Sequence, residues 1–128
     1  MPRKESMKPS NNLLFPKPGK KKKRKPKPRP SILQDKDGRC FLCMLLDNNN
    51  FYYPDIEEHH AFGGNPNRTN STIEGLTVYL CPRHHREGPE AVHRNDKINR
   101  IVKRYAQTIW EQNHTREEFQ KKFGKSCL

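Results

Sequence analysis

Long apolar runs are missing from this chain, and apolar residues as a whole are few. Hydrophobic side chains make up 30% of the 128 residues and charged ones 31%, which is a low apolar share for a fully globular protein. No run approaches the roughly 20 residues of a membrane-spanning helix, and no apolar signal-peptide core follows Met1. We therefore expect a cytoplasmic protein without membrane contact, in which one modest domain packs around a core and the rest forms tails.

Acidic residues are almost absent from the N-terminal segment. Residues 1–30 contain twelve Lys and Arg side chains and a single acid, Glu5, so nearly all of the net charge of +12 lies there. Seven of the eleven prolines lie there too, and such a composition cannot bury enough apolar surface to offset the entropy of ordering. We expect residues 1–31 to form a disordered basic tail that contacts phosphates; a solubilising tail or a targeting address is the alternative. The densest part of this tail is Lys20, Lys21, Lys22, Lys23, Arg24 and Lys25.

Cysteine is scarce, and its spacing is informative. The four cysteines of a cytosolic chain are better interpreted as metal ligands than as disulfides. Cys40-Phe-Leu-Cys43 and Cys81-Pro-Arg-His84 repeat a two-residue ligand spacing, and two such pairs can hold one tetrahedral zinc with three sulfurs and one nitrogen. The gap between the pairs, residues 44–80, is too long for a DNA-reading zinc finger, in which it is about 12 residues. The spacing thus predicts a structural zinc and leaves Cys127 as a free surface thiol.

Histidine is in surplus over what this zinc requires. Five of the six histidines fall in the segment from 59 to 93. Once His84 is assigned to the zinc, four of them remain: His59, His60, His85 and His93. A neutral imidazole has an unperturbed pKa of about 6.5, so it can bind a divalent cation or take a proton from water near pH 7. These residues are therefore the candidates for chemistry.

The remaining patterns predict a small α+β unit. In chain order we expect a turn at 37–38, a hairpin of extended segments at 51–53 and 56–62, a flexible loop at 63–71, a strand at 76–80, and a short helix from Pro82 to Gly88. Apolar residues with a period of 3.6 predict an amphipathic helix from Asp96 to about Gln112. The capping box Thr115-x-x-Glu118 begins a last helix, which stops at Gly124.

This order of motifs resembles the HNH endonucleases, which have the ββα-metal (His-Me finger) fold. The shared order is Cys-x-x-Cys, a His-His pair in a strand, a Gly/Asn-rich loop and Leu-Cys-x-x-His-His, over roughly residues 39–95. The short basic chain, with Val-His-Arg-Asn after the last knuckle, is most similar to phage and prophage members. The resemblance implies a nuclease domain over 32–128, with a zinc and ββα-metal core at about 39–95 and a helical extension at 96–124.

The resemblance also implies roles for three of the histidines. His59 would bind the catalytic divalent cation, His60 would be the general base, and His85 would be a further ligand of the cation. Successive residues of a regular strand point to opposite faces. His59 and His60 can therefore share one centre only if the strand ends, twists or bulges at this pair.

One family residue has no clear counterpart. The family carries an Asn about five residues before the Leu-Cys, where this chain has Gly75 and Leu76. Asn65, Asn67 and Asn70 lie further back in the loop. His93 is then the candidate substitute, either as a ligand or as a phosphate contact.

The function predicted is metal-dependent hydrolysis of phosphodiester bonds in DNA, with RNA left open. Arg86 and Arg94 flank the histidines and are expected, with the basic tail, to contact nucleic acid. Beside the structural Zn²⁺, the reaction needs a divalent cation, for which Mg²⁺, Mn²⁺, Ni²⁺ and Zn²⁺ are open. The alternative is a zinc-stabilised nucleic-acid-binding module without catalytic activity. The resemblance implies phage recombination or packaging proteins as partners, in the cytoplasm of a bacterial host, and the oligomeric state stays open.

Overall fold

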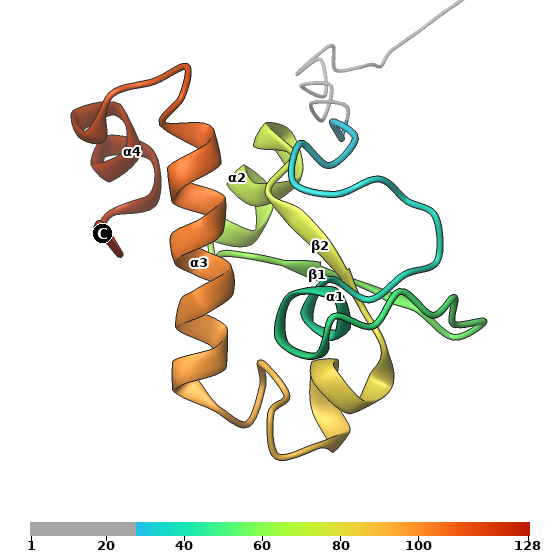
Figure 1. The fold of residues 1–128 in the computed structure, drawn as a ribbon. Coiled ribbons are helices and arrows are strands. Elements are labelled where there is room, and N and C mark those ends of the chain that lie inside the picture. The colour runs from blue at the N-terminus through green and yellow to red at the C-terminus, as the bar shows by residue number, and fades with distance from the viewer. Residues whose placement is uncertain (1–27) are drawn as a thin grey trace, which may run out of the picture.

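The computed structural model describes residues 28–128, which form a small mixed α/β fold with a two-stranded sheet (Figure 1). The elements in chain order are α1 (Phe41–Asp47), β1 (Glu57–His60), α2 (Asn67–Glu74), β2 (Thr77–Leu80), the π-helical turn η1 (Arg83–Glu87), α3 (Asp96–Trp110) and α4 (Arg116–Phe123). Residues 1–27 of the tail expected over 1–31, with the Lys/Arg run at 20–25, lie outside the described residues. The end of that segment packs on the fold instead of forming a disordered tail, because the backbone N–H of Arg29 donates to the Thr72 carbonyl at 3.1 Å and the Ser31 hydroxyl donates to the Thr77 carbonyl. Within residues 28–128, no helix is both long enough and apolar enough to cross a membrane.

The sheet pairs β1 with β2 in antiparallel register, and His60 at the end of β1 lies opposite Thr77. All four residues of β2 are buried, as its apolar sequence leads one to expect, and both β1 and α1 pack against it. The expected strand over 76–80 is therefore confirmed. It leads directly into Cys81 and η1.

The hairpin expected between 51–53 and 56–62 is wrong. The aromatic stretch makes a single isolated bridge, from Tyr52 to Arg39, and Tyr52 is 70% exposed. Pro54 follows at once and has no N–H with which to continue a ladder. The strand that carries the histidines therefore pairs with the buried β2 instead.

The flexible loop expected at 63–71 is also wrong, because α2 begins inside it. The contacts that stabilise this helix are tertiary. The side-chain amides of Asn67 and Asn70 each donate to a backbone carbonyl near the end of α4, at 3.0 Å. The buried Ser71 hydroxyl hydrogen-bonds both backbone groups of Phe62, at 2.9 and 3.2 Å. A polar sequence thus becomes helical through partners that lie elsewhere in the chain.

The three helical segments expected after β2 are confirmed. Pro82 precedes η1 and Gly88 ends it. The side chain of Asn95 caps α3 by accepting from two backbone N–H groups of its first turn. A reciprocal capping box of Thr115 and Glu118 begins α4.

The first Cys-x-x-Cys knuckle opens a short helix. The Sγ of Cys40 caps α1 by accepting from the backbone N–H of Cys43, at 3.4 Å. The helix ends where Asn48 takes a left-handed conformation, with φ of 52°. The turn expected at 37–38 is present, and Gly38 has φ of 94°, which favours glycine.

The core lies between the sheet, α1 and α3, with α4 closing its far end. Its fully buried apolar side chains include Leu42, Leu76, Val78, Leu80, Val102 and Phe119. Figure 1 shows α3 standing between α4 on one side and the sheet with α1 on the other. Trp110 is 2% exposed and donates its ring N–H to Glu74 of α2 at 2.9 Å. The helical extension is thus part of the same core as the sheet.

Candidate metal centres and the cleft beside them

Four candidate metal ligands converge between α1 and η1. Cys40 and Cys43 belong to the start of α1, Cys81 follows β2, and His84 lies in η1. None of the four is more than 2% exposed, and their ligand atoms lie within 4.8 Å of one another. These are the residues that the repeated two-residue spacing selects; we call them the Cys₃His cluster.

The distances within the Cys₃His cluster fit a tetrahedral zinc ion. The Nδ1 atom of His84 lies 3.5, 3.3 and 3.5 Å from the sulfurs of Cys40, Cys43 and Cys81, and the last two sulfurs are 3.8 Å apart. Zn–S bonds of about 2.3 Å and Zn–N bonds of about 2.0 Å at tetrahedral angles require about 3.5 Å between S and N and about 3.8 Å between two sulfurs. The cluster can therefore hold a metal ion such as zinc.

The surroundings of the sulfurs also suit a metal. Burial raises the pKa of the Cys40 thiol to about 12, because a thiolate is poorly solvated there. A bound cation reverses this preference, since a coordinating thiol is deprotonated outright. The Tyr53 hydroxyl, 3.2 Å from the Cys43 sulfur, and the Arg83 guanidinium, 3.9 Å from it, are positioned to donate to that thiolate.

A second group of possible ligands is made of histidine alone. His59 of β1, His85 of η1 and His93 from the segment before α3 present ring nitrogens within 4.8 Å of one another. The ring centroids are 5.3 Å apart for His59 and His85, 5.2 Å for His59 and His93, and 4.7 Å for His85 and His93. We call these three residues the His₃ cluster. The structure thus brings His93 to the two histidines named by the family resemblance.

Glu57 fixes which nitrogen of His85 faces the cluster. Its carboxylate lies 2.6 Å from the Nδ1 atom of His85, so Nδ1 carries the proton and donates it. The Nε2 atom, on the opposite side of the ring, faces the Nε2 atom of His93 at 3.1 Å. A carboxylate behind a histidine in this way is the usual support of a metal-binding imidazole.

His59 contributes a buried nitrogen that has no partner. The residue is 8% exposed, and its Nε2 atom makes no hydrogen bond within the described part of the chain. Burial, and then the neighbouring His85 and His93, lower its pKa to about 3. Burial also lowers the pKa of His93. Both rings are therefore neutral at pH 7 and available as ligands, so the His₃ cluster also suits a divalent cation.

The helical turn η1 contributes one histidine to each cluster. His84 and His85 are consecutive in η1, yet the first faces the three sulfurs and the second faces His59 and His93. Successive residues of a helical turn project in different directions, which allows neighbours to reach two separate centres. The position of η1 therefore determines both sites at once.

His60 lies beside the His₃ cluster but is not part of it. Both His60 and the cluster line one cleft of about 430 Å³, and His60 is the last residue of β1, paired with Thr77. Burial, and then the nearby Arg68, lower the pKa of His60, so its ring is neutral at pH 7. The structure thus gathers all four surplus histidines around one cleft.

The cleft is also lined by three positive side chains, two of which the sequence did not single out. Arg68 comes from α2, Arg86 from η1 and Lys103 from α3, whereas Glu58 is the one carboxylate among the lining residues. Arg86 was an expected nucleic-acid contact; Arg68 and Lys103 were missed. Arg68 lies in the segment that the sequence predicts to be a loop. Lys103 lies on the polar face of the predicted amphipathic helix, among other polar residues.

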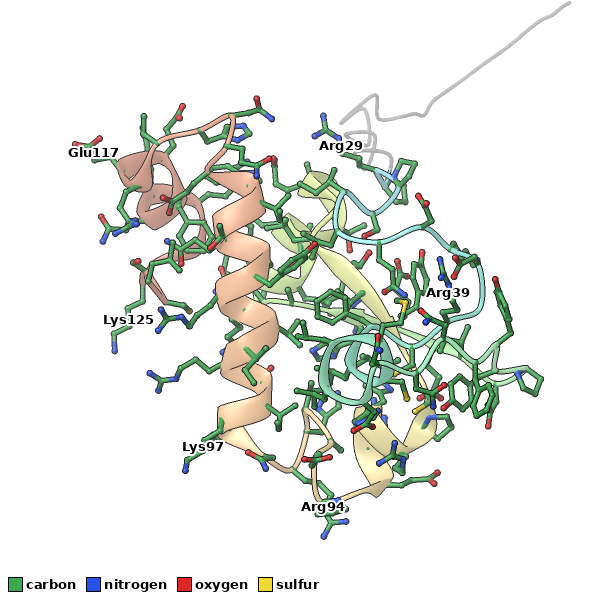
Figure 2. The ribbon with its side chains drawn as sticks, in the orientation of Figure 1. Arg29, Arg39, Arg94, Lys97, Glu117 and Lys125 are labelled. Atoms are coloured by element: carbon green, nitrogen blue, oxygen red, sulfur yellow. The ribbon has the colours of Figure 1, made fainter. Side chains whose placement is uncertain are left out.

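Arg94 does not line the cleft, contrary to its expected place beside the histidines. It donates to the backbone carbonyl of Glu87 at 2.7 Å, and Figure 2 shows it extending outward at the edge of the molecule. Arg83 does not line the cleft either, and it forms an ion pair with Asp47 at 3.4 Å.

Cys127, expected to be a free surface thiol, is half-buried rather than fully exposed and packs against the core.

Comparison with known proteins yields no match: no protein-family profile, no curated protein and no solved structure is significantly similar to this chain. The case for a function therefore rests on the clusters and the cleft themselves.

Proposed function

We propose that this protein is a metal-dependent endonuclease of the HNH type that hydrolyses phosphodiester bonds in DNA. The observation that carries the proposal is the meeting of the three imidazoles of the His₃ cluster with His60 in one cationic cleft. The order β1, β2 and η1, with histidines on the first strand and on the helix, agrees with the ββα-metal arrangement that the resemblance implies.

In this proposal the Cys₃His cluster is the structural zinc site. It is completely enclosed, which leaves no open position for a substrate, and closed four-ligand sites are typical of structural zinc. Zinc there would tie the start of α1 to η1, and it would thereby fix His85, the residue after the ligand His84.

His59, His85 and His93 would hold the catalytic cation, with Glu57 holding the ring of His85. A divalent ion bound there would stabilise negative charge on the phosphate and on the leaving oxygen. An all-imidazole set suits Zn²⁺ and Ni²⁺ better than Mg²⁺, which prefers oxygen ligands.

His60 is the proposed general base. Its neutral ring takes a proton from the attacking water, the water oxygen bonds to phosphorus, and the bond to the leaving oxygen breaks. Arg68, Arg86 and Lys103 line the same cleft, where their charges can offset the extra negative charge of the transition state.

The experiment that tests this function is cleavage of supercoiled plasmid by the full-length protein. It is run with Mg²⁺, Mn²⁺, Ni²⁺ or Zn²⁺ and with EDTA, beside His60→Ala and the control His114→Ala. His114 stacks on Trp110 at 3.8 Å and does not line the cleft. We expect nicking by the wild type and the control, and at least a hundredfold slower nicking by His60→Ala, as for loss of a general base. Equal cutting by all three proteins would refute the role of His60.

A binding module without catalysis is the second candidate, and one observation favours it. The amides of Asn67 and Asn70 are committed to backbone carbonyls of the α4 region, so neither is free to act as the missing Asn of the family. If the wild type binds DNA but cuts none in any of the cations, this candidate replaces the nuclease.

A further inference from the structure

A second hollow adjoins the cleft along α3. It is bordered by residues of α3, by the end of α4 and by the C-terminal segment, with Phe62 and Phe123 among its lining residues. Asn99 and Lys103 line both the cleft and this hollow. The two depressions are therefore continuous across one face of α3.

The positive charges along this path have no acidic partner in the part of the chain that the structure describes. The cleft contributes Arg68 and Arg86, the hollow contributes Arg100 and Lys125, and Lys103 belongs to both. Within residues 28–128, none of these five forms an ion pair.

Among the other basic residues of the folded part, some are paired with acids, and others, such as Arg104 and Lys121, are unpaired within the described residues but lie away from this path. Arg39, Arg83, Arg116 and Lys122 are each paired with an acid, and none of them lines the cleft or the hollow. Asp96 is the acid among the residues that line the hollow. Unpaired cations collected along one path, with few acids beside them, create a positive potential that favours a polyanion.

From this arrangement we propose that the cleft and the hollow form one track for the phosphate backbone of DNA, running from the His₃ cluster along α3 to Lys125. We call Arg68, Arg86, Lys103, Arg100 and Lys125 the phosphate track. Figure 2 shows Lys125 extending from the C-terminal segment on the α3 side. The inference rests on the proposed function for the identity of the polyanion, but it makes its own prediction about binding.

The track predicts which cations matter for salt-dependent affinity. Each phosphate contact releases counterions. The logarithm of the binding constant therefore decreases with the logarithm of the salt concentration, and the magnitude of this slope becomes smaller by about 0.9 for every contact removed on duplex DNA. Arg100→Gln with Lys125→Gln removes two contacts of the track that lie away from the histidines. Arg104→Gln with Lys121→Gln is the matched control, because it removes the same residue types from α3 and α4, both exposed and neither lining the cleft or the hollow.

The experiment measures binding of a short labelled DNA duplex to the full-length, zinc-loaded protein by fluorescence anisotropy over a series of KCl concentrations, without any further divalent cation. We expect the slope of the track variant to be smaller by about 1.8 than that of the wild type, and the control to keep most of the wild-type slope. Equal slopes for the two double variants would overturn the track.

Cys127 gives a second measurement on the same proteins. It lines the hollow and is the one cysteine outside the Cys₃His cluster. Bound DNA should slow its alkylation by a maleimide several-fold in the wild type and in the control, and less in the track variant. Protection that is equal in both double variants would contradict the track.

Failure of the track and failure of the nuclease are distinguishable. If the wild type cuts plasmid while both double variants have equal slopes, the nuclease proposal is supported and the track is refuted. A wild type that cuts nothing while the slopes differ as expected leaves a DNA-binding track without the nuclease.

Discussion

The two clusters are neighbours that meet at the consecutive residues His84 and His85 of η1, yet they differ in access. The Cys₃His cluster has four ligands that are all completely buried, whereas in the His₃ cluster His59 and His85 are buried and His93 is exposed. The first has no room for a substrate, and the second opens on a cationic cleft. Enclosure suits a metal that holds the fold, and an open position suits one that acts on a substrate.

The comparison predicts that loss of the Cys₃His cluster is the most damaging change. Cys40→Ser should leave the domain unfolded, because a structural zinc contributes about 10–16 kcal/mol in small zinc-binding domains, as much as the whole stability of most folds. Circular dichroism and zinc content check this, with Cys127→Ser as the control that removes a thiol outside the cluster. A Cys40→Ser protein with a wild-type spectrum and melting temperature would show that zinc does not hold this fold.

Loss of the His₃ cluster should instead spare the fold. His93 is exposed, so we expect His93→Ala to change the unfolding free energy by no more than about 0.5 kcal/mol. Bound metal should fall from two ions per chain to one, measured by elemental analysis after loading with excess Zn²⁺ and gel filtration. His114→Ala is the histidine control and should keep two. Two ions in His93→Ala would show that the third histidine is not a ligand.

The smallest expected effect concerns Glu57, whose carboxylate accepts a hydrogen bond from His85. Glu57→Gln should weaken metal binding at the His₃ cluster by about 10- to 100-fold, the usual result of losing a carboxylate behind a ligand histidine. The Cys₃His metal should be unaffected. Glu58→Gln removes the same charge from the next residue, which has no hydrogen bond to the His₃ cluster. Titration with a competing metal chelator measures the difference, and equal affinities in the two variants would argue against the role of Glu57.

Prediction from sequence succeeded where the signal was local. The apolar run before Cys81, the break at Gly88 and the capping box at Thr115 each depend on a few consecutive residues, and each describes the structure correctly. The repeated spacing of the Cys₃His cluster is local in the same sense, since each knuckle is a single turn.

Prediction failed where distant segments decide the structure. The sequence predicts a loop where α2 forms, because the partners that stabilise this helix are Phe62 and backbone groups near the end of α4. The pairing of β1 was misassigned because its partner is the buried β2 and not the nearby aromatic stretch. Arg68 and Lys103 were missed for the same reason, as each reaches the cleft from a different helix.

The sequence by itself determined the composition of the Cys₃His cluster, because ligand spacing within a knuckle is set by local geometry. It also marked which histidines were in surplus. Only the tertiary structure decided that His93 joins His59 and His85, that Glu57 stands behind His85, and that unpaired cations follow α3. Those contacts join segments that no sequence period relates, so they exist only once β1, η1 and α3 have packed together.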